Sequence, residues 1–536
     1  MTRSEPQTGR YTSVAPANVA EGWTLTRLTQ PSRLYCANGL RTGADGRIYV
    51  AQVVASQISA IDIETGAIET ISPMGGDIVG PDDLVFDPAG NLYVTEITEG
   101  RVSVREPNGA TRVICGDMPI ANPITFHQGR LFAGECRPGG RIMELDLNGG
   151  AARVLLEDIP MANAMEVGPD GKLYFPVMGT NEIWRIGLDG GAPEKVAGDL
   201  GVPDAVKFDS KGFIVSTQIK SGQVLRIDPR TGDRTVLADV APGLDNLTFV
   251  GDRLFVSSIS GQVNEVLGDG KIRSLVPDGL NWPLGLAMGE DGLLFVADGG
   301  FVYTLRPGGS LQVAGMLFSE GFPGYTRGVA VSGPGEFVVT TSSGELARFL
   351  PARHESNVLA RGFDQLYGVA IGHGGAVAFA ELGTGRVLSV ASGTVEQLAT
   401  GLREPMGVAI SPDGTCFVAE SGGRRVVKLS GGKVETVLDG LQRPQGIVLH
   451  EGLLYVVDVG AKELIEYDML KKVRRTIACN LPIGSPPGVT PKALRAILPL
   501  AGPMGPFAGI AAGANGTLYV SGDAEGSVLE VRRAPP

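Results

Sequence analysis

The sequence has little of the residue types and patterns that mark several large classes of protein. Among its 536 residues there are only five cysteines and four histidines. The cysteines lack the close spacing of a zinc site, and the histidines are too scattered for a multi-histidine metal centre or a Ser-His-Asp triad. No apolar run is long enough to span a bilayer, and the first twenty residues are polar, so neither a membrane span nor a signal peptide is expected. Free thiols are typical of a reducing compartment, so we predict a cytoplasmic protein.

Helical periodicity and positive charge are also scarce. The net charge of −12 disfavours binding to nucleic acid or to an anionic membrane. No glycine-rich phosphate loop precedes a helical pattern, so a nucleotide cofactor is not indicated. The only segment with a convincing helical pattern is 490–498, for which the sequence predicts a short helix.

The chain is instead rich in glycine and contains an internal sequence repeat. There are 78 glycines without collagen periodicity, as expected for many tight hairpins. A unit of about forty residues recurs along the chain, and each copy shows short strand patterns around an Asp-Gly or Asn-Gly turn. The clearest copy is 405–420. A period of this length with four strands per unit is typical of β-propeller blades, so the sequence predicts an all-β chain of twelve four-stranded blades.

Twelve blades exceed the usual size of one ring, so we predict two consecutive six-bladed β-propellers, with a seven-plus-five division as the alternative. The expected domains are an N-terminal tail at 1–22, a first propeller at 23–269 and a second at 270–536. We expect segment 23–28 to complete the blade at 244–266, so that the first ring has no open edge. By the same reasoning, segment 271–276 is expected to complete the last blade at 507–533.

The two halves of the chain differ in residue type at one position of the repeat. Just before the first strand of each unit, a residue that we call the marker is Asn or Asp in all six units of the first half and is neither in the second half. The markers of the first half are Asn38, Asp82, Asn122, Asn163, Asp204 and Asp245, and those of the second half are Leu284, Arg327, Tyr367, Met406, Gln445 and Ala508.

Propeller geometry brings the six markers of a ring together. The innermost strand of each blade begins beside the central channel, so the six side chains should form a circle around its mouth. Side chains that end the second strands, Glu96, Glu135 and Gln218 among them, should lie behind that circle. Because hard cations prefer oxygen ligands, we predict a divalent metal at Asn38, Asp82, Asn163, Asp204 and Asp245. Ca²⁺ is the expected ion, with Zn²⁺, Mg²⁺ and Mn²⁺ as alternatives.

Asn and Asp also favour turns because they hydrogen-bond to the nearby backbone. That explanation predicts the same residues in the matching loops of the second half, where they are absent. A functional circle is therefore favoured over a purely structural one.

Two segments resemble the family of gluconolactonase and senescence marker protein, whose members are six-bladed propellers. Residues 163–175 resemble its Asn-Gly-Leu segment with a Pro-Asp-Gly turn, and 204–212 resemble its Asp-Gly segment one blade later. The resemblance covers roughly 30–265 and implies that Asn163 and Asp204 bind a metal, that Asp204 is the general base and that Asn122 contacts the substrate. The family's first ligand is a Glu, where this chain has Asn38. The second half resembles generic propeller repeats of the NHL and virginiamycin lyase kind.

These observations lead to a hypothesis of function. The first propeller is predicted to be a metal-dependent hydrolase of a small lactone or ester, in which Asp204 or Glu135 accepts a proton and Asn122, Glu96 and Gln218 hold the substrate. A lyase or isomerase that uses the same metal is one alternative, and a non-catalytic binding propeller is another. For the latter, the markers of the second ring would offer a surface to a partner. The sequence does not indicate an oligomeric state.

A long insertion at 481–507 interrupts the repeat before the last blade and contains the predicted helix. It should reach the mouth of the second ring. We consider it either a lid over the first site or a cover of the second channel.

Overall fold

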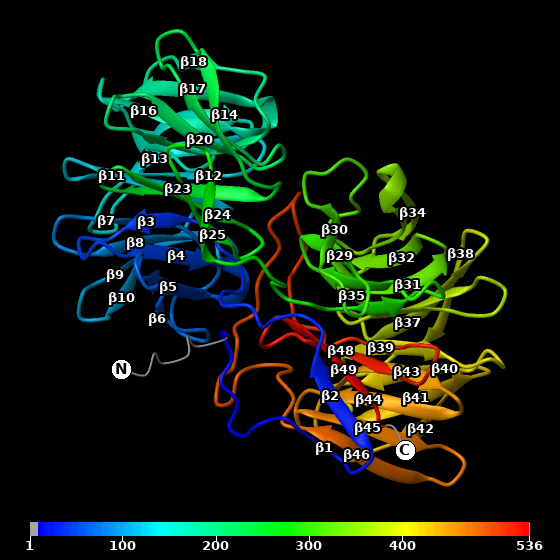
Figure 1. Ribbon diagram of the computed structural model, residues 1–536. Helices are drawn as coiled ribbons and strands as arrows, with labels where there is room; N and C mark the ends of the chain where they lie inside the picture. Colours follow the sequence, from blue (N-terminus) through cyan, green and yellow to red (C-terminus); the bar gives the residue numbers. More distant parts are fainter. Residues whose placement is uncertain (1–8, 535–536) are drawn as a thin grey trace, which may run out of the picture. The chain divides into compact units, whose positions relative to one another are not determined.

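The computed structural model describes residues 9–534, and these residues form 49 strands in twelve sheets (Figure 1). Eleven sheets have four strands and one has five. The predicted all-β fold of twelve blades in two consecutive propellers is confirmed. No helix among residues 9–534 is long and apolar enough to cross a membrane.

The first compact unit contains residues 33–278 together with 490–499. Each of its six blades is a four-stranded antiparallel meander of consecutive strands. Blades one and two are β3 (Leu40–Thr42), β4 (Ile48–Gln52), β5 (Gln57–Ile61), β6 (Ile68–Ser72), and β7 (Pro81–Phe86), β8 (Leu92–Glu96), β9 (Arg101–Arg105), β10 (Thr111–Cys115). Blades three and four are β11 (Ala121–His127), β12 (Arg130–Glu135), β13 (Gly140–Leu145), β14 (Arg153–Ile159), and β15 (Glu166–Val167), β16 (Lys172–Val177), β17 (Glu182–Gly187), β18 (Glu194–Ala197). Blades five and six are β19 (Pro203–Phe208), β20 (Ile214–Gln218), β21 (Gln223–Ile227), β22 (Arg234–Asp239), and β23 (Leu244–Val250), β24 (Arg253–Ser258), β25 (Val263–Val266), β26 (Ile272–Val276).

The second unit contains residues 9–32, 279–489 and 500–534. Its first three blades are β27 (Leu286–Met288), β28 (Leu294–Asp298), β29 (Phe301–Leu305), β30 (Gln312–Met316); β31 (Thr326–Gly333), β32 (Glu336–Thr341), β33 (Glu345–Leu350), β34 (Glu355–Arg361); and β35 (Leu366–Ile371), β36 (Val377–Glu381), β37 (Arg386–Ala391), β38 (Thr394–Ala399). Blades four and five are β39 (Pro405–Ile410), β40 (Cys416–Glu420), β41 (Arg425–Ser430), β42 (Lys433–Leu438), and β43 (Pro444–His450), β44 (Leu453–Asp458), β45 (Glu463–Asp468), β46 (Val473–Cys479). The last blade is β47 (Ile510–Ala512), β48 (Leu518–Gly522) and β49 (Ser527–Arg533) with β2 (Trp23–Arg27), and β1 (Asn18–Val19) joins blade five.

Short 3-10 turns are the helical elements of the described residues: η1 (Val53–Ala55), η2 (Met178–Thr180) and η3 (Pro351–Arg353). The helix predicted at 490–498 is wrong, because this segment has no helical turn. An isolated helix of nine residues is marginal without a matching apolar surface. The segment instead belongs to the first unit, where Leu494 is buried.

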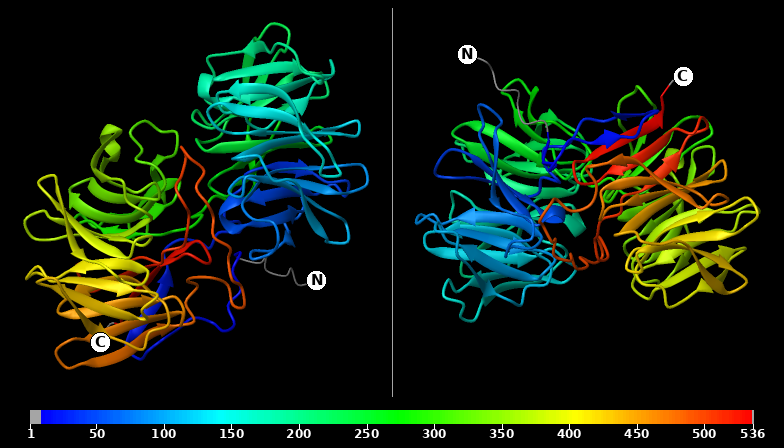
Figure 2. Two further views of the ribbon diagram at one scale, coloured as in Figure 1. Left: turned by 180° about the vertical axis from the view of Figure 1, so that it is seen from behind. Right: turned by 90° about the horizontal axis from the view of Figure 1, so that it is seen from below.

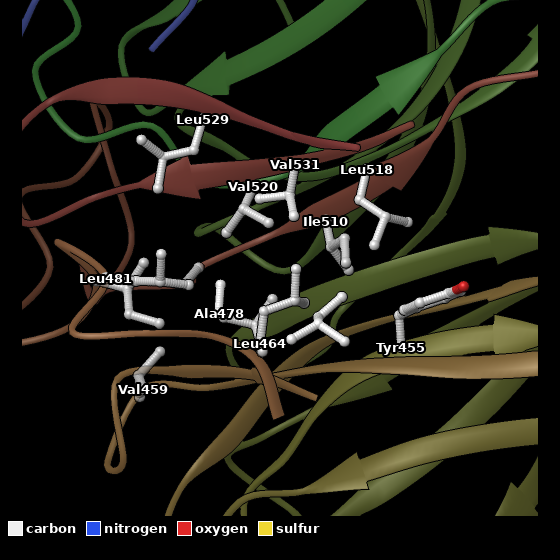
Figure 3. Close-up of a cluster of buried hydrophobic side chains, with 14 of the residues drawn as sticks. Tyr455, Val459, Leu464, Ala478, Leu481, Ile510, Leu518, Val520, Leu529 and Val531 are labelled. Atoms are coloured by element: carbon white, nitrogen blue, oxygen red, sulfur yellow. The ribbon is translucent and has the colours of Figure 1, made fainter. Parts of the chain in front are cut away.

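Apolar side chains pack between neighbouring blades and hold each ring together. Figure 3 shows one such layer, between blades five and six of the second propeller. Alternate residues of each strand face this layer, which is the pattern of a sheet covered on both faces. The labelled side chains are Tyr455, Val459, Leu464, Ala478, Leu481, Ile510, Leu518, Val520, Leu529 and Val531.

The rings close differently from the prediction. Strand β2 pairs with β49, with Trp23 opposite Arg533, and therefore completes the last blade of the second ring. The blue and red strands lie side by side in Figures 1 and 2. Strand β26, which we expected there, pairs with β25 and completes the first ring. A short hairpin through Asp269 connects β25 to β26, and closing such a loop loses far less chain entropy than a pairing across hundreds of residues.

The division between the units consequently lies between Asp278 and Gly279, not at 269 and 270. Part of the expected N-terminal tail is also structured. Strand β1 pairs with β46, and the Arg10 guanidinium donates to the carbonyls of Asp523 and Ala524, each at 3.1 Å. Residues 1–8 of that tail lie outside the described residues.

The closure predicts a local effect of one core substitution. Trp23 is 5% exposed, packs in the layer of Figure 3 and lies 4.8 Å from the Arg533 guanidinium. Trp23→Ala should lower the free energy of unfolding of the second propeller by about 3–5 kcal/mol. Hydrogen exchange, followed peptide by peptide, should show faster opening in 279–489 and no change in 33–278.

A matched control lies on the same strand. Thr26 is exposed, so Thr26→Ala should change stability by less than about 0.5 kcal/mol. If Trp23→Ala accelerated exchange in 33–278 instead, the role of β2 in closing the second ring would be contradicted.

Candidate functional site

In four of the six blades of the first ring, a β-bulge lies at the marker. In blade two of the first ring, Pro81 pairs with Glu96 and Leu84 pairs with Val94, so the inner strand carries one extra residue at Asp82 and Asp83. The same shift follows the strand start in blades three, five and six of this ring. A bulge bends the strand and re-aims the side chain at that point. The second ring has the bulge too, at Arg327 and Gly328 among other places, so the two rings differ in residue type rather than in backbone.

Five of the six predicted markers of the first ring come together: Asn38, Asp82, Asn163, Asp204 and Asp245. The Asn38 amide donates to Asp245 Oδ2 at 3.1 Å, and the Asn163 amide donates to Asp204 Oδ2 at 3.1 Å. Asp82, Asn122, Asn163, Asp204 and Asp245 are between 4% and 8% exposed, whereas Asn38 is half-buried. Among the described residues, no side-chain hydrogen bond or ion pair engages Asp82 or the Asn122 amide. The circle therefore has free polar groups at its surface.

The three aspartates of the circle repel one another. Burial raises the pKa of Asp82 and of Asp204 well above the usual range, and the charge of Asp245 raises both further. Burial likewise raises the pKa of Asp245 to about 7, although the hydrogen bond from Asn38 opposes this. In the part of the chain that the structure describes, none of these carboxylates has a Lys or Arg within ion-pair distance. Such uncompensated negative charge is the environment that a bound cation would stabilise.

The donor set fits a hard divalent cation. It offers carboxylate and amide oxygens and no charged competitor. Within residues 9–534, no three Asp, Glu, His or Cys side chains form a metal site by themselves, so amide oxygens and water would have to contribute. The Oδ1 atoms of the amides now accept backbone N–H groups, that of Ala164 at Asn163 and that of Val53 at Asn38. Each amide would therefore have to turn to become a ligand.

The predicted second circle has a different role. Glu96 is fully buried, accepts the Val79 N–H at 2.7 Å and pairs with Arg101 at 2.6 Å. Gln218 accepts the Gly201 N–H at 3.0 Å. These side chains bind the loop that precedes the inner strand of their own blade, so they do not face a substrate.

Glu135, predicted as a second candidate base, is also fully buried and is paired with Arg137 at 2.8 Å and with Arg141. The second ring repeats the loop contact: Asp298, Glu381 and Asp458 accept N–H groups of the preceding loops at 2.7–2.8 Å. A contact that recurs in both rings stabilises the blade itself and is not specific to a site in one ring. We therefore leave Glu96, Glu135 and Gln218 out of the proposed catalytic set.

A layer of ion pairs beneath the circle was not predicted. Glu166 accepts from Arg41 at 2.9 Å and from Lys207 at 2.8 Å, and Arg41 also donates to the Leu84 and Ile124 carbonyls. Burial alone would raise the pKa of Glu166, but Lys207 and Arg41 outweigh it and bring the pKa to about 2. These three residues follow the markers Asn38, Asn163 and Asp204 by three positions, and a charge at that point of an apolar strand was the available signal. The layer gives the circle a rigid, charged floor.

The two cysteines near the circle are unsuited to nucleophilic catalysis. Burial raises the pKa of Cys36 to about 12 and that of Cys136 well above the usual range. Cys36 donates to Asn38 Oδ1 at 3.1 Å. Because only the thiolate is a good nucleophile, neither thiol is suited to that role.

Part of the insertion belongs to the rim of the first propeller. Arg495 lies 3.6 Å from Glu99, and a pocket of about 300 Å³ opens beside them. Ile97, Met118 and Ile120 also line this pocket. Ile97 directly follows the end of β8, and Ile120 precedes the marker Asn122 by two residues. Its volume suits a small molecule.

The markers of the second ring do not form an open surface. Arg327, Tyr367, Met406 and Gln445 are at most 4% exposed. Residues 500–507 of the insertion, which we call the strap, contact this mouth; the Phe507 ring lies 6.0 Å from that of Tyr367. The expected partner surface is therefore covered by the chain itself.

Residues 125–260 match the family model described as the SMP-30/Gluconolactonase/LRE-like region. The expected resemblance is thereby confirmed for this segment, which includes Asn163 and Asp204. No curated protein matches the chain. Among solved structures, the chain is similar to a streptogramin B lyase, with 18% identity and a TM-score of 0.39 over 55% of this chain and 100% of that one.

Two further structures give comparable values. Virginiamycin B lyase from Staphylococcus aureus has 17% identity and a TM-score of 0.39 over 52% of this chain and 96% of that one. A protein provisionally assigned as a gluconolactonase has 18% identity and a TM-score of 0.38 over 48% of this chain and 95% of that one. Likenesses at this level concern the fold and not the reaction.

The ion pairs of Glu166 predict that the stability of the first propeller depends on pH. Because the pKa of Glu166 is lowered from 4.5 to about 2, its ion pairs stabilise the folded state above pH 4.5 and lose that contribution as the pH falls towards 2. Glu166→Gln should destabilise the first propeller by about 3 kcal/mol at pH 7 and much less near pH 2. Urea unfolding at the two pH values measures this difference.

Glu194 provides the control, because it pairs with Lys172 and Arg185 on the surface and is half exposed. Glu194→Gln should change the stability far less than Glu166→Gln does at pH 7, because solvent screens this surface pair. An equally small effect of Glu166→Gln at pH 7 would show that the floor contributes nothing to stability.

Proposed function

We propose that the first propeller is a divalent-metal-dependent hydrolase of a small lactone or ester. The observation that carries this proposal is the circle of three buried aspartates without a cationic partner. The family match over 125–260 supports a lactonase-like hydrolase, and the second ring lacks a comparable circle.

Asn163 and Asp204 are the proposed principal ligands, with Asn38, Asp82 and Asp245 completing the set. A divalent ion bound there would act as a Lewis acid on the substrate carbonyl or on a water. Ca²⁺ suits the oxygen-only donor set best.

Asp204 is the proposed general base. Its Oδ2 accepts from the Asn163 amide, while its Oδ1 has no hydrogen-bond partner among the described residues. The hydrogen bond fixes the orientation of the carboxylate, and the free oxygen can take the proton of an attacking water. The carboxylate needs its negative charge for this step, and a neighbouring cation would lower its raised pKa.

Asn122 is the residue proposed to orient the substrate. Its amide has no hydrogen-bond partner among the described residues and could donate to a ring or ester oxygen. Below it, the ion pairs of Glu166 keep the channel floor fixed, so a small substrate approaches from the mouth.

The metal is tested by elemental analysis of the purified protein after dialysis against Ca²⁺. We expect one divalent ion per chain, loss of that ion in Asp204→Asn and no loss in Asp252→Asn, which alters an exposed turn of the same propeller. Retention of the ion by Asp204→Asn would overturn the ligand assignment.

The reaction is tested with a panel of small lactones and esters in water enriched in oxygen-18. Hydrolysis requires one solvent oxygen in the acid product, and Asp204→Asn should lower kcat by about a hundredfold or more. Turnover without solvent oxygen would point to a lyase or isomerase instead. A protein that binds no metal and turns over no member of the panel would favour a binding propeller.

A further inference from the structure

The second propeller holds a buried cation, Arg327, that no carboxylate of the described residues neutralises. Arg327 is the largest fully buried side chain of the described residues, and it occupies the marker position of its blade. Its guanidinium donates to two main-chain carbonyls only, that of Leu366 at 3.1 Å and that of Pro503. Within residues 9–534, no carboxylate lies within ion-pair distance of it, and its Nε has no partner.

Such an arrangement is unfavourable for the folded chain. Removing a guanidinium from water without a counter-charge costs much more than two carbonyl contacts return. The face of Tyr367, 4.2 Å away, offsets part of this loss by a cation–π contact. The unpaired Nε remains, and an oxyanion is the group that a guanidinium fork binds best.

The Pro503 carbonyl reaches Arg327 from the strap. The strap is neutral and has no regular strand or helix. Besides isolated backbone bridges at Ala501 and Met504, the Gly502 N–H donates to Ser342 Oγ at 2.9 Å, and just after the strap the Ala508 N–H donates to Gln445 Oε1 at 2.7 Å. A segment that lacks regular secondary structure can open locally and exchange with a competing ligand.

The surroundings of Arg327 indicate which anion would compete. One guanidinium supplies a single positive charge, which suits a monovalent carboxylate better than a phosphate dianion. Tyr367, Met406 and Leu284 provide apolar surface at the neighbouring marker positions, and the strap adds Phe507. The ligand should therefore combine a carboxylate with an apolar body.

We propose that the axial site of the second propeller binds an amphipathic monocarboxylate on Arg327, in exchange for the Pro503 carbonyl. The strap is the internal competitor for this site. The proposal is independent of the reaction of the first propeller and involves no covalent step.

The test uses the full chain and isothermal titration with octanoate, with octanamide as the neutral analogue and inorganic phosphate as the alternative oxyanion. Octanoate should bind once per chain and octanamide at least about tenfold more weakly, because the amide has no charge to pair with Arg327. Arg327→Met should weaken octanoate at least about tenfold. Arg230→Met, at an exposed arginine of the first propeller, should leave octanoate binding unchanged.

Ser342→Ala keeps the test decisive if Arg327→Met does not fold. Loss of the Ser342 hydroxyl frees one end of the strap, so octanoate should bind about fivefold more tightly. Octanoate should also accelerate chymotrypsin cleavage after Phe507. Failure of octanoate to bind both the natural protein and Ser342→Ala would overturn the proposal, as would equal binding of octanamide, undiminished binding by folded Arg327→Met, or a preference for phosphate.

Discussion

The bulge at the start of the inner strand is the constraint on which both propellers depend. One extra residue, at Asp82 and Asp83 in the first ring and at Arg327 and Gly328 in the second, bends the strand and turns the marker towards the axis. Because the backbone repeats from blade to blade, the chemistry of each channel is set by the residue types at one position. The first ring has placed oxygen donors there, and the second has placed a guanidinium among apolar side chains.

The blades and the circle could be predicted because both follow from local spacing. A forty-residue period gives the propeller, and one position per period gives the circle of Asp204 and its neighbours. Ring closure could not be predicted in this way, because β2 and β26 have similar alternating patterns and the pattern does not encode the partner. The predicted roles of Glu96 and Glu135 were wrong for a related reason. The sequence gives the positions of these residues, but it does not show that a loop N–H binds Glu96 or that an arginine pairs with Glu135.

The two channel axes carry buried charge of opposite sign. In the first ring, Asp82, Asp204 and Asp245 share negative charge above a floor in which two carboxyl groups, Glu166 and Asp83, lie near two cations, Arg41 and Lys207. The upper layer is incomplete without a ligand, while the lower layer is complete in itself. In the second ring, Arg327 is covered by the strap, whose carbonyl supplies a dipole but no charge. The presence or absence of a counter-charge therefore distinguishes buried charged groups that stabilise the channel from those that we propose to bind a ligand.

The pairing of β2 with β49 has a consequence for the order in which the chain can fold. All strands of the first ring lie between Leu40 and Val276, so that ring can close while the rest of the chain is still being synthesised. The second ring needs Trp23 opposite Arg533, two residues at nearly opposite ends of the chain. Strand β2 must therefore wait for its partner until β49 has been synthesised, and the first propeller can fold while β2 is still free.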